Sequence, residues 1–118
     1  MSQWDLKVRT KAFALRAIRL VEPFTGNRAA EVIARQLVRS ATSVGANYRE
    51  SCRARSPAEF IAKLGIVEEE LDECIYWMEL IRDTNLIPLN DLADLAREAN
   101  ELLAITVASI KTARKGRQ

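Results

Sequence analysis

The chain has 118 residues, 48% apolar and 29% charged, with four glycines and three prolines, which is typical of one helical globular domain spanning residues 1–118. Eighteen basic and sixteen acidic side chains leave a net charge of +2, and histidine is absent. The absence of histidine excludes Ser-His-Asp and Cys-His nucleophilic sites, histidine-based zinc sites and the Glu-x-x-His motif of di-iron bundles.

The first two predicted helices span about residues 3–21 and 28–54. In the first, apolar residues recur at helical spacing at Leu6, Phe13, Ala17, Leu20 and Val21, and residues 22–27, with one proline and one glycine, end it. In the second, the apolar positions are Ala30, Ile33, Leu37, Ala41, Val44 and Tyr48. Steps of three and four over this length predict a long amphipathic helix.

The last two predicted helices span about residues 57–83 and 90–112. Ser56, Pro57 and Glu59 form a capping-box pattern that predicts the start of the third helix. In a capping box, the side chains of Ser56 and Glu59 would each accept a hydrogen bond from the backbone N–H of the other residue. Asn90 is the expected cap of the fourth helix. Residues 111–118 are expected to fray as a basic tail. Because the connections are short, the chain is predicted to be all-α, an antiparallel up-down-up-down four-helix bundle.

Charge is divided unevenly along the chain. Residues 1–55 carry eleven basic and four acidic side chains, a net charge of +7, whereas residues 56–110 carry three basic and twelve acidic ones, a net charge of −9. Seen along the axis of the second helix, five arginines fall within about a quarter turn, and we call them the arginine stripe: Arg28, Arg35, Arg39, Arg49 and Arg53. Two interpretations follow: pairing with the acidic helices, within or between subunits, or binding of nucleic-acid phosphates without sequence specificity. Four basic residues of the tail would extend a phosphate-binding surface: Lys111, Arg114, Lys115 and Arg117.

A second row on the same helix, the polar seam, occupies positions that normally hold apolar side chains: Gln36, Ser40, Ser43, Asn47 and Glu50. It is either a solvated face or a hydrogen-bond network that fixes the register of helices or subunits. Folding the second helix against the third places Arg39 close to Glu70 or Glu73, so an ion pair is predicted there. Gln36, Arg39, Ser40, Ser43, Asn47, Glu50, Glu70 and Glu73 are the candidate structural polar network.

The cysteines and tryptophans do not indicate a catalytic site. Cys52 and Cys74 form no CxxC motif and are interpreted as small buried hydrophobes. Trp4 and Trp77 are expected in the core or at a subunit interface, because base stacking would require an exposed ring beside the arginines. The sequence contains no signal-peptide pattern and no long uncharged apolar run, so a cytoplasmic protein without membrane association is expected.

The segment 34–87 resembles the bacterial four-helix-bundle family associated with intervening sequences of 23S rRNA genes. On the second helix the resemblance is carried by the pattern Gln-x-x-Arg-Ser-x-x-Ser-x-x-x-Asn-x-x-Glu, met by Gln36, Arg39, Ser40, Ser43, Asn47 and Glu50. On the third helix it is carried by Ser56, Glu59, Phe60, Ile61, Lys63, Leu64, Glu70, Glu73, Tyr76, Trp77, Glu79 and Leu80. Ser51 departs from the family pattern, in which a glycine follows the glutamate, and this puts the joint between these helices in doubt.

This resemblance implies a ring-like homopentamer, similar to the accessory proteins of diversity-generating retroelements that bind nucleic acid and a reverse transcriptase. It implies no enzymatic activity and no cofactor. We therefore expect a non-enzymatic oligomeric interaction module that binds RNA or DNA. The alternatives are a protein partner without nucleic-acid binding, or a Mg²⁺-dependent nucleotide hydrolase. The carboxylates of the hydrolase would come from Glu70 and Glu73, together with either Asp91 and Asp94 or Glu98 and Glu101.

Overall fold

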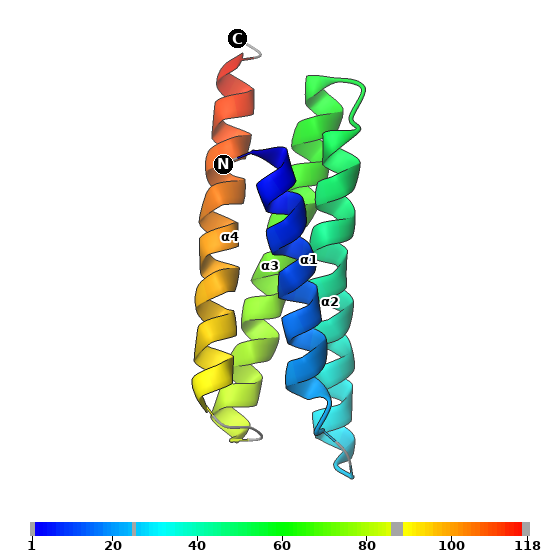
Figure 1. The fold of residues 1–118 in the computed structure, drawn as a ribbon, viewed down its shortest axis with the longest axis vertical. Helices are drawn as coiled ribbons and strands as arrows, with labels where there is room; N and C mark the ends of the chain where they lie inside the picture. The colour runs from blue at the N-terminus through cyan, green and yellow to red at the C-terminus, as the bar shows by residue number, and fades with distance from the viewer. Residues whose placement is uncertain (1, 25, 86–88, 117–118) are drawn as a thin grey trace.

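The computed structural model describes residues 2–24, 26–85 and 89–116, excluding the side chains of residues 89 and 90. Within these residues the secondary structure consists of α1 (Gln3–Val21), α2 (Arg28–Cys52), α3 (Pro57–Thr84) and α4 (Leu89–Gly116). Successive helices run in opposite directions and form an elongated bundle of 52 × 21 × 20 Å (Figure 1). The predicted up-down-up-down four-helix bundle is confirmed. Among the described helices, none is both long and apolar enough to cross a membrane.

The core lies along the bundle axis at the predicted apolar positions. Phe13, Leu37, Leu71 and Leu95, one from each helix, are at most 1% exposed. α1 packs against α2 and α4, and α3 packs against the same two helices, so α1 and α3 occupy opposite corners of the bundle. The contact between α2 and α3 is the most extensive and that between α1 and α4 the least.

α1 approaches α2 closely at Gly45. A Cβ atom at this position would lie 3.3 Å from Oγ1 of Thr10, a buried side chain that donates its hydroxyl to the carbonyl oxygen of Leu6 at 2.7 Å. A glycine in mid-helix normally destabilises the helix, and here it makes room for the neighbouring helix.

The joint between α2 and α3 differs in detail from the prediction. α2 ends at Cys52 rather than near residue 54, and Ser51, at the position of the family glycine, is buried and donates its hydroxyl to the carbonyl oxygen of Tyr48 at 2.6 Å. Ser56 caps α3 by accepting the Glu59 N–H at 3.1 Å. The Glu59 carboxylate, however, accepts from the N–H of Arg55 and not from that of Ser56, so the predicted capping box is only half formed.

α4 is longer than predicted at both ends. It begins at Leu89, which places Asn90 inside the helix and not before it, and the Asn90 side chain lies outside the described residues. It continues to Gly116, so the tail expected to fray is helical through that residue. Ile110 is still buried near this end, and the cations Arg114 and Lys115 interact favourably with the partial negative charge of a helix C-terminus.

Candidate interaction surface

Arg39 is the centre of the polar contacts between α2 and α3. Its Nη2 lies 2.7 Å from Oε1 of Glu73, and its Nη1 lies 3.5 Å from Oε2 of Glu70, so the predicted ion pair is confirmed. Arg39 also donates to Oγ of Ser40 at 3.1 Å and to Oε1 of Gln36 at 3.4 Å. Burial raises the pKa of the Glu70 carboxyl above its usual value, and the charge of Arg39 opposes that shift.

The rest of the polar seam makes separate, mostly local contacts. Asn47 donates its side-chain amide to the carbonyl oxygen of Ser43 at 2.9 Å, within α2. Glu50 pairs with Nζ of Lys63 on α3 at 3.0 Å. The candidate structural polar network therefore links α2 to α3 within one chain at two places, through Arg39 and through Glu50.

A second ion pair, between α1 and α4, was not predicted. Arg9 contacts Glu98 through two hydrogen bonds, Nη2 to Oε1 at 2.5 Å and Nε to Oε2 at 3.1 Å, and its Nη2 lies 3.6 Å from Oε2 of Glu101. The side chains of Arg9 and Glu98 are only 24% and 16% exposed. The hydrogen bond to Glu98 raises the pKa of Arg9. Glu98 and Glu101, carboxylates of the hydrolase alternative, therefore lie against a guanidinium.

The cysteines lie in apolar surroundings. Cys74 is buried and Cys52 half-buried, and both are free thiols. Burial, with the nearby charges of Glu70 and Glu73, raises the pKa of the Cys74 thiol to about 12. A thiol with that pKa is not a nucleophile at neutral pH. Among the described residues, no group of three or more His, Cys, Asp or Glu side chains is arranged to hold a metal ion.

The arginine stripe divides into Arg39, which forms ion pairs, and four residues that form none among the described residues. Arg28, Arg35, Arg49 and Arg53 are exposed and, within the described part of the chain, none of them forms an ion pair. Among the described residues of one chain, pairing of the stripe with the acidic helices is therefore limited to Arg39, and pairing between subunits stays a prediction. In α4, Lys111, Arg114 and Lys115 are also exposed, whereas Arg117 lies outside the described residues.

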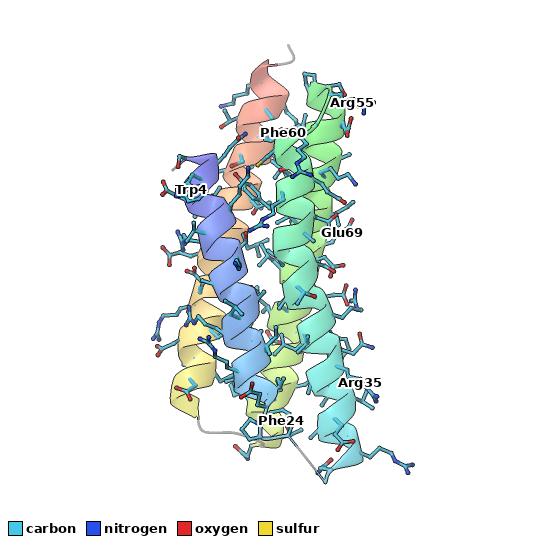
Figure 2. All side chains as sticks on the ribbon, turned by 45° about the vertical axis from the view of Figure 1, so that its right-hand side comes forward. Trp4, Phe24, Arg35, Arg55, Phe60 and Glu69 are labelled. Carbon is cyan, nitrogen blue, oxygen red and sulfur yellow. The ribbon has the colours of Figure 1, made fainter. Side chains whose placement is uncertain are left out.

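The two halves of the stripe lie at opposite ends of α2. Arg28 and Arg35 belong to the first three turns, whereas Arg49 and Arg53 adjoin the α2–α3 loop. Figure 2 shows Trp4 at the end of the bundle opposite to Arg35. Arg49 and Arg53 therefore share their end of the bundle with the start of α1 and the end of α4 (Figure 1).

α1 carries a row of exposed apolar side chains on the side away from the core, which we call the α1 ridge. Its members, with their exposed fractions, are Trp4 (72%), Val8 (51%), Leu15 (41%) and Ile18 (37%). Trp4 was expected in the core or at a subunit interface; it does not lie in the core of this chain, and an interface position stays a prediction. Apolar residues on two faces of one helix are typical of a helix that is covered on both.

Part of this ridge lines a groove between α1 and α2 with a volume of about 550 Å³. The groove, which we call the basic groove, is lined by Trp4, Lys7, Val8, Lys11, Ala12, Leu15, Arg49 and Arg53. It contains four cations and no acidic side chain. Trp4 therefore meets the condition set for base stacking, an exposed ring beside the arginines. Trp77 does not: its ring is half-buried, with its centroid 5.1 Å from that of Tyr76, and its indole N–H is buried without a partner among the described residues.

Comparison with known proteins decides the family. A family model described as 23S rRNA-intervening sequence protein matches residues 4–108. The chain belongs to this family. A crystal structure of a protein of unknown function from the S23 ribosomal protein family of Bacteroides thetaiotaomicron VPI-5482 superimposes with a TM-score of 0.86 and 32% sequence identity, covering 94% of this chain and 99% of the other. Among curated proteins, none matches the chain.

Membership in the 23S rRNA-intervening sequence protein family confirms the resemblance noted for residues 34–87 and extends it to α1 and most of α4. The matched region includes the α1 ridge and all residues of the basic groove. It stops before the final cations of α4, Lys111 to Lys115, which lie beyond residue 108.

Proposed function

We propose that this 23S rRNA-intervening sequence protein is a non-enzymatic interaction module that associates with copies of itself, as the ring-like homopentamer that the family resemblance implies. The observation that carries the proposal is the α1 ridge. Trp4 and Val8 are more than half exposed, and Leu15 and Ile18 extend the same row. A row of large exposed apolar side chains on one helix, interrupted only by Lys11, is characteristic of a protein–protein contact.

The physical case rests on the position of the ridge. Single exposed hydrophobes need no explanation, and Val32 on α2, 45% exposed, is one. The ridge differs because four large side chains lie at steps of four, seven and three on one helix, and Trp4, Val8 and Leu15 line one groove. When an assembly covers these side chains, each Å² of apolar surface removed from water stabilises the assembly by about 25 cal/mol.

Light scattering and native mass spectrometry test the proposal. The chain mass is 13.3 kDa, and we expect the purified, nuclease-treated protein to have a mass several times larger. Trp4→Ser with Leu15→Ser should shift it toward the monomer. Val32→Ser, an exposed apolar residue outside the ridge, is the matched control and should not. A wild-type protein that is monomeric at micromolar concentration would refute self-association.

A second function, binding of RNA or DNA phosphates, is favoured by the basic end of the bundle. Arg55 and Gly116 line the same hollow between the α2–α3 loop and the end of α4, and the exposed cations Arg53, Arg114 and Lys115 adjoin it in sequence. Side chains of this kind contact phosphates and not base edges, so binding would be independent of sequence and weakened by salt.

Fluorescence anisotropy with a labelled RNA and DNA of matched sequence tests the second function. Charge reversal by Arg114→Glu with Lys115→Glu should lower affinity and reduce the slope of log K against log salt by about two. Reversal of Arg28 and Arg35 at the opposite end should have a smaller effect. Affinity that does not change between low and high salt would exclude phosphate binding.

A further inference from the structure

The α1 ridge requires a partner with a particular chemistry, because cations border it. On α1, Lys7 lies beside the ridge and Lys11 within it. Arg49 of α2 and Arg53, which follows the end of α2, lie across the groove, and among the described residues no carboxylate lines the groove. Arg49 and Arg53 have no ion pair within the described residues, so their charges are available to a partner. A partner surface that covers this groove should therefore have small apolar side chains where it meets the ridge and carboxylates where it meets the cations.

This chain presents such a surface on α3. We call it the α3 outer face: Ala58, Ala62, Gly65, Glu69, Asp72 and Tyr76, which follow one another at steps of four and three and therefore share one side of the helix. All of them are exposed except Gly65, which is half-buried. An added Cβ at Gly65 would meet nothing within 4 Å.

The acidic residues of the α3 outer face are also unused within the chain. Glu69 and Asp72 form no ion pair among the described residues, in contrast to Glu70 and Glu73, which contact Arg39. Tyr76 is 53% exposed and offers an aromatic ring next to them. The face therefore combines small residues over the first turns of α3 with an acidic and aromatic continuation.

The two faces lie on opposite corners of the bundle. Among the described residues the backbones of α1 and α3 do not adjoin each other, and each of these helices packs between α2 and α4. The basic groove and the α3 outer face can therefore be occupied at the same time by two different neighbours. A closed ring of more than two copies in cyclic symmetry requires this arrangement, because each copy must present two different, complementary surfaces.

We infer that the basic groove of one copy binds the α3 outer face of the next, so that copies associate head to tail. Trp4 and Val8 lie against the small residues around Gly65, and the groove cations lie against Glu69 and Asp72. This inference rests on the self-association proposed above and specifies its two surfaces. The net charges of +7 on residues 1–55 and −9 on residues 56–110 bring unlike faces together and keep like faces apart.

Charge reversal on each face tests the inference. The groove variant is Lys11→Glu with Arg49→Glu, and the face variant is Glu69→Lys with Asp72→Lys. Each should be monomeric by sedimentation velocity, with association weakened at least about a hundredfold, because each pair of reversed charges then faces charges of the same sign across the contact. Circular dichroism checks that each variant remains helical. The matched control is Arg28→Glu with Arg35→Glu, on the same helix as Arg49 but outside the groove, and it should assemble like the wild type.

Mixing the two variants provides the decisive measurement. The reversed groove of one variant is complementary to the reversed face of the other, and the two unaltered surfaces also remain complementary. Because each complementary contact joins one variant to the other, native mass spectrometry of the mixture should show assemblies that contain both variants, as open chains or rings with an even number of copies, since a ring of five copies cannot alternate without one mismatched contact.

A face variant that assembles like the wild type would overturn the inference while leaving self-association intact. A groove variant that stays assembled but loses RNA binding would overturn it in favour of nucleic acid as the occupant of the groove. Variants that are separately monomeric and remain so when mixed would also overturn it. A monomeric wild type would overturn both the inference and the proposed self-association.

Discussion

Replacing Arg9 by methionine should destabilise the bundle more than any other single ion-pair substitution. Methionine keeps much of the apolar stem of Arg9 but removes both hydrogen bonds to Glu98, whose side chain is 16% exposed. A hydrogen bond to a charged group contributes about 1.5–3 kcal/mol, and leaving a partly buried charge unpaired adds a desolvation cost. Because Glu98 regains some water in the variant, we expect a loss of about 2 kcal/mol, or about 8 °C in Tm for a domain of this size.

Urea unfolding followed by circular dichroism at 222 nm measures this loss. All variants are compared at one protein concentration, because self-association adds a concentration-dependent stabilisation. Arg97→Met is the control, since Arg97 pairs with Asp94 on the surface of α4, where both side chains are more than half exposed, and its loss should cost less than about 0.5 kcal/mol. Because α1 and α4 share the least extensive helix contact, amide exchange should accelerate most in α1.

A double-mutant cycle with Glu98→Gln isolates the pair itself. We expect a coupling energy of about 1–2 kcal/mol between Arg9 and Glu98. Glu101, 68% exposed and 3.6 Å from Arg9, should couple much more weakly. If Arg9→Met is no more destabilising than Arg97→Met, or if the coupling energy is below about 0.5 kcal/mol, the pair does not hold α1 to α4 and the reasoning fails.

Three further predictions concern the helices themselves. In the Trp4→Ser, Leu15→Ser background, in which the proposed contact with Gly65 of a neighbouring copy is removed, Gly65→Ala should stabilise the protein by about 0.5–1 kcal/mol, since its Cβ meets open space within the chain. Gly45→Val should destabilise it by about 1–3 kcal/mol because its side chain meets α1; thermal melts compare the two. Ser56→Ala should cost about 1 kcal/mol by removing the cap of α3, and Ser56→Asp should restore it. The pKa of the Glu70 carboxyl, measured by ¹³C NMR, should lie above its usual value and rise further in Arg39→Met. Because folding raises this pKa, ionisation of Glu70 lowers the stability of the fold as the pH rises from the unfolded-state pKa through the folded-state pKa. An unchanged pKa in Arg39→Met would contradict the conclusion that the charge of Arg39 acts on Glu70.

The contact of Arg39 with Glu73 could be predicted because only one short loop separates α2 from α3. Ser56 marks the start of α3, so positions on the two antiparallel helices can be counted outward from that point. The same counting fails for Arg9 and Glu98. They lie 89 positions apart, and their register depends on every intervening helix and loop. Sequence spacing contains no rule that relates the first helix of a bundle to the last.

The α1 ridge was missed for a different reason. Helical periodicity identifies apolar faces, but it does not state which face meets the core when a helix has two. Phe13 and Ala17 lie on the core face and Val8 and Leu15 on the opposite one, and both sets have helical spacing. The available signal was the helical spacing of Trp4, Val8 and Leu15, which defines a second apolar row on α1, interrupted by Lys11. The separation of α1 into one apolar and one polar side is therefore weaker than that of α2, where arginines line the outward side.

The sequence underestimates the length of α4 because residues 111–118 have few apolar positions and are predicted to fray as a basic tail. Lys111, Arg114 and Lys115 are three cations within five residues, which repel one another in an isolated segment. At the C-terminus of an established helix the same cations face unpaired carbonyl groups, and the buried Ile110 holds the preceding turn in the bundle. The position of a charged run relative to a helix end therefore decides its effect.

The distribution of ion pairs indicates what the charge asymmetry is for. Of the eleven basic residues in positions 1–55, only Arg9 and Arg39 form ion pairs with the acidic half of the chain among the described residues. If the asymmetry served folding alone, most of these cations would face carboxylates across the helix contacts, yet Arg49 and Arg53 point to a groove without any. Glu69 and Asp72 likewise remain unpaired on the opposite corner. The opposed charges therefore belong to two separate surfaces of one molecule, and they can neutralise each other only when a second copy is present.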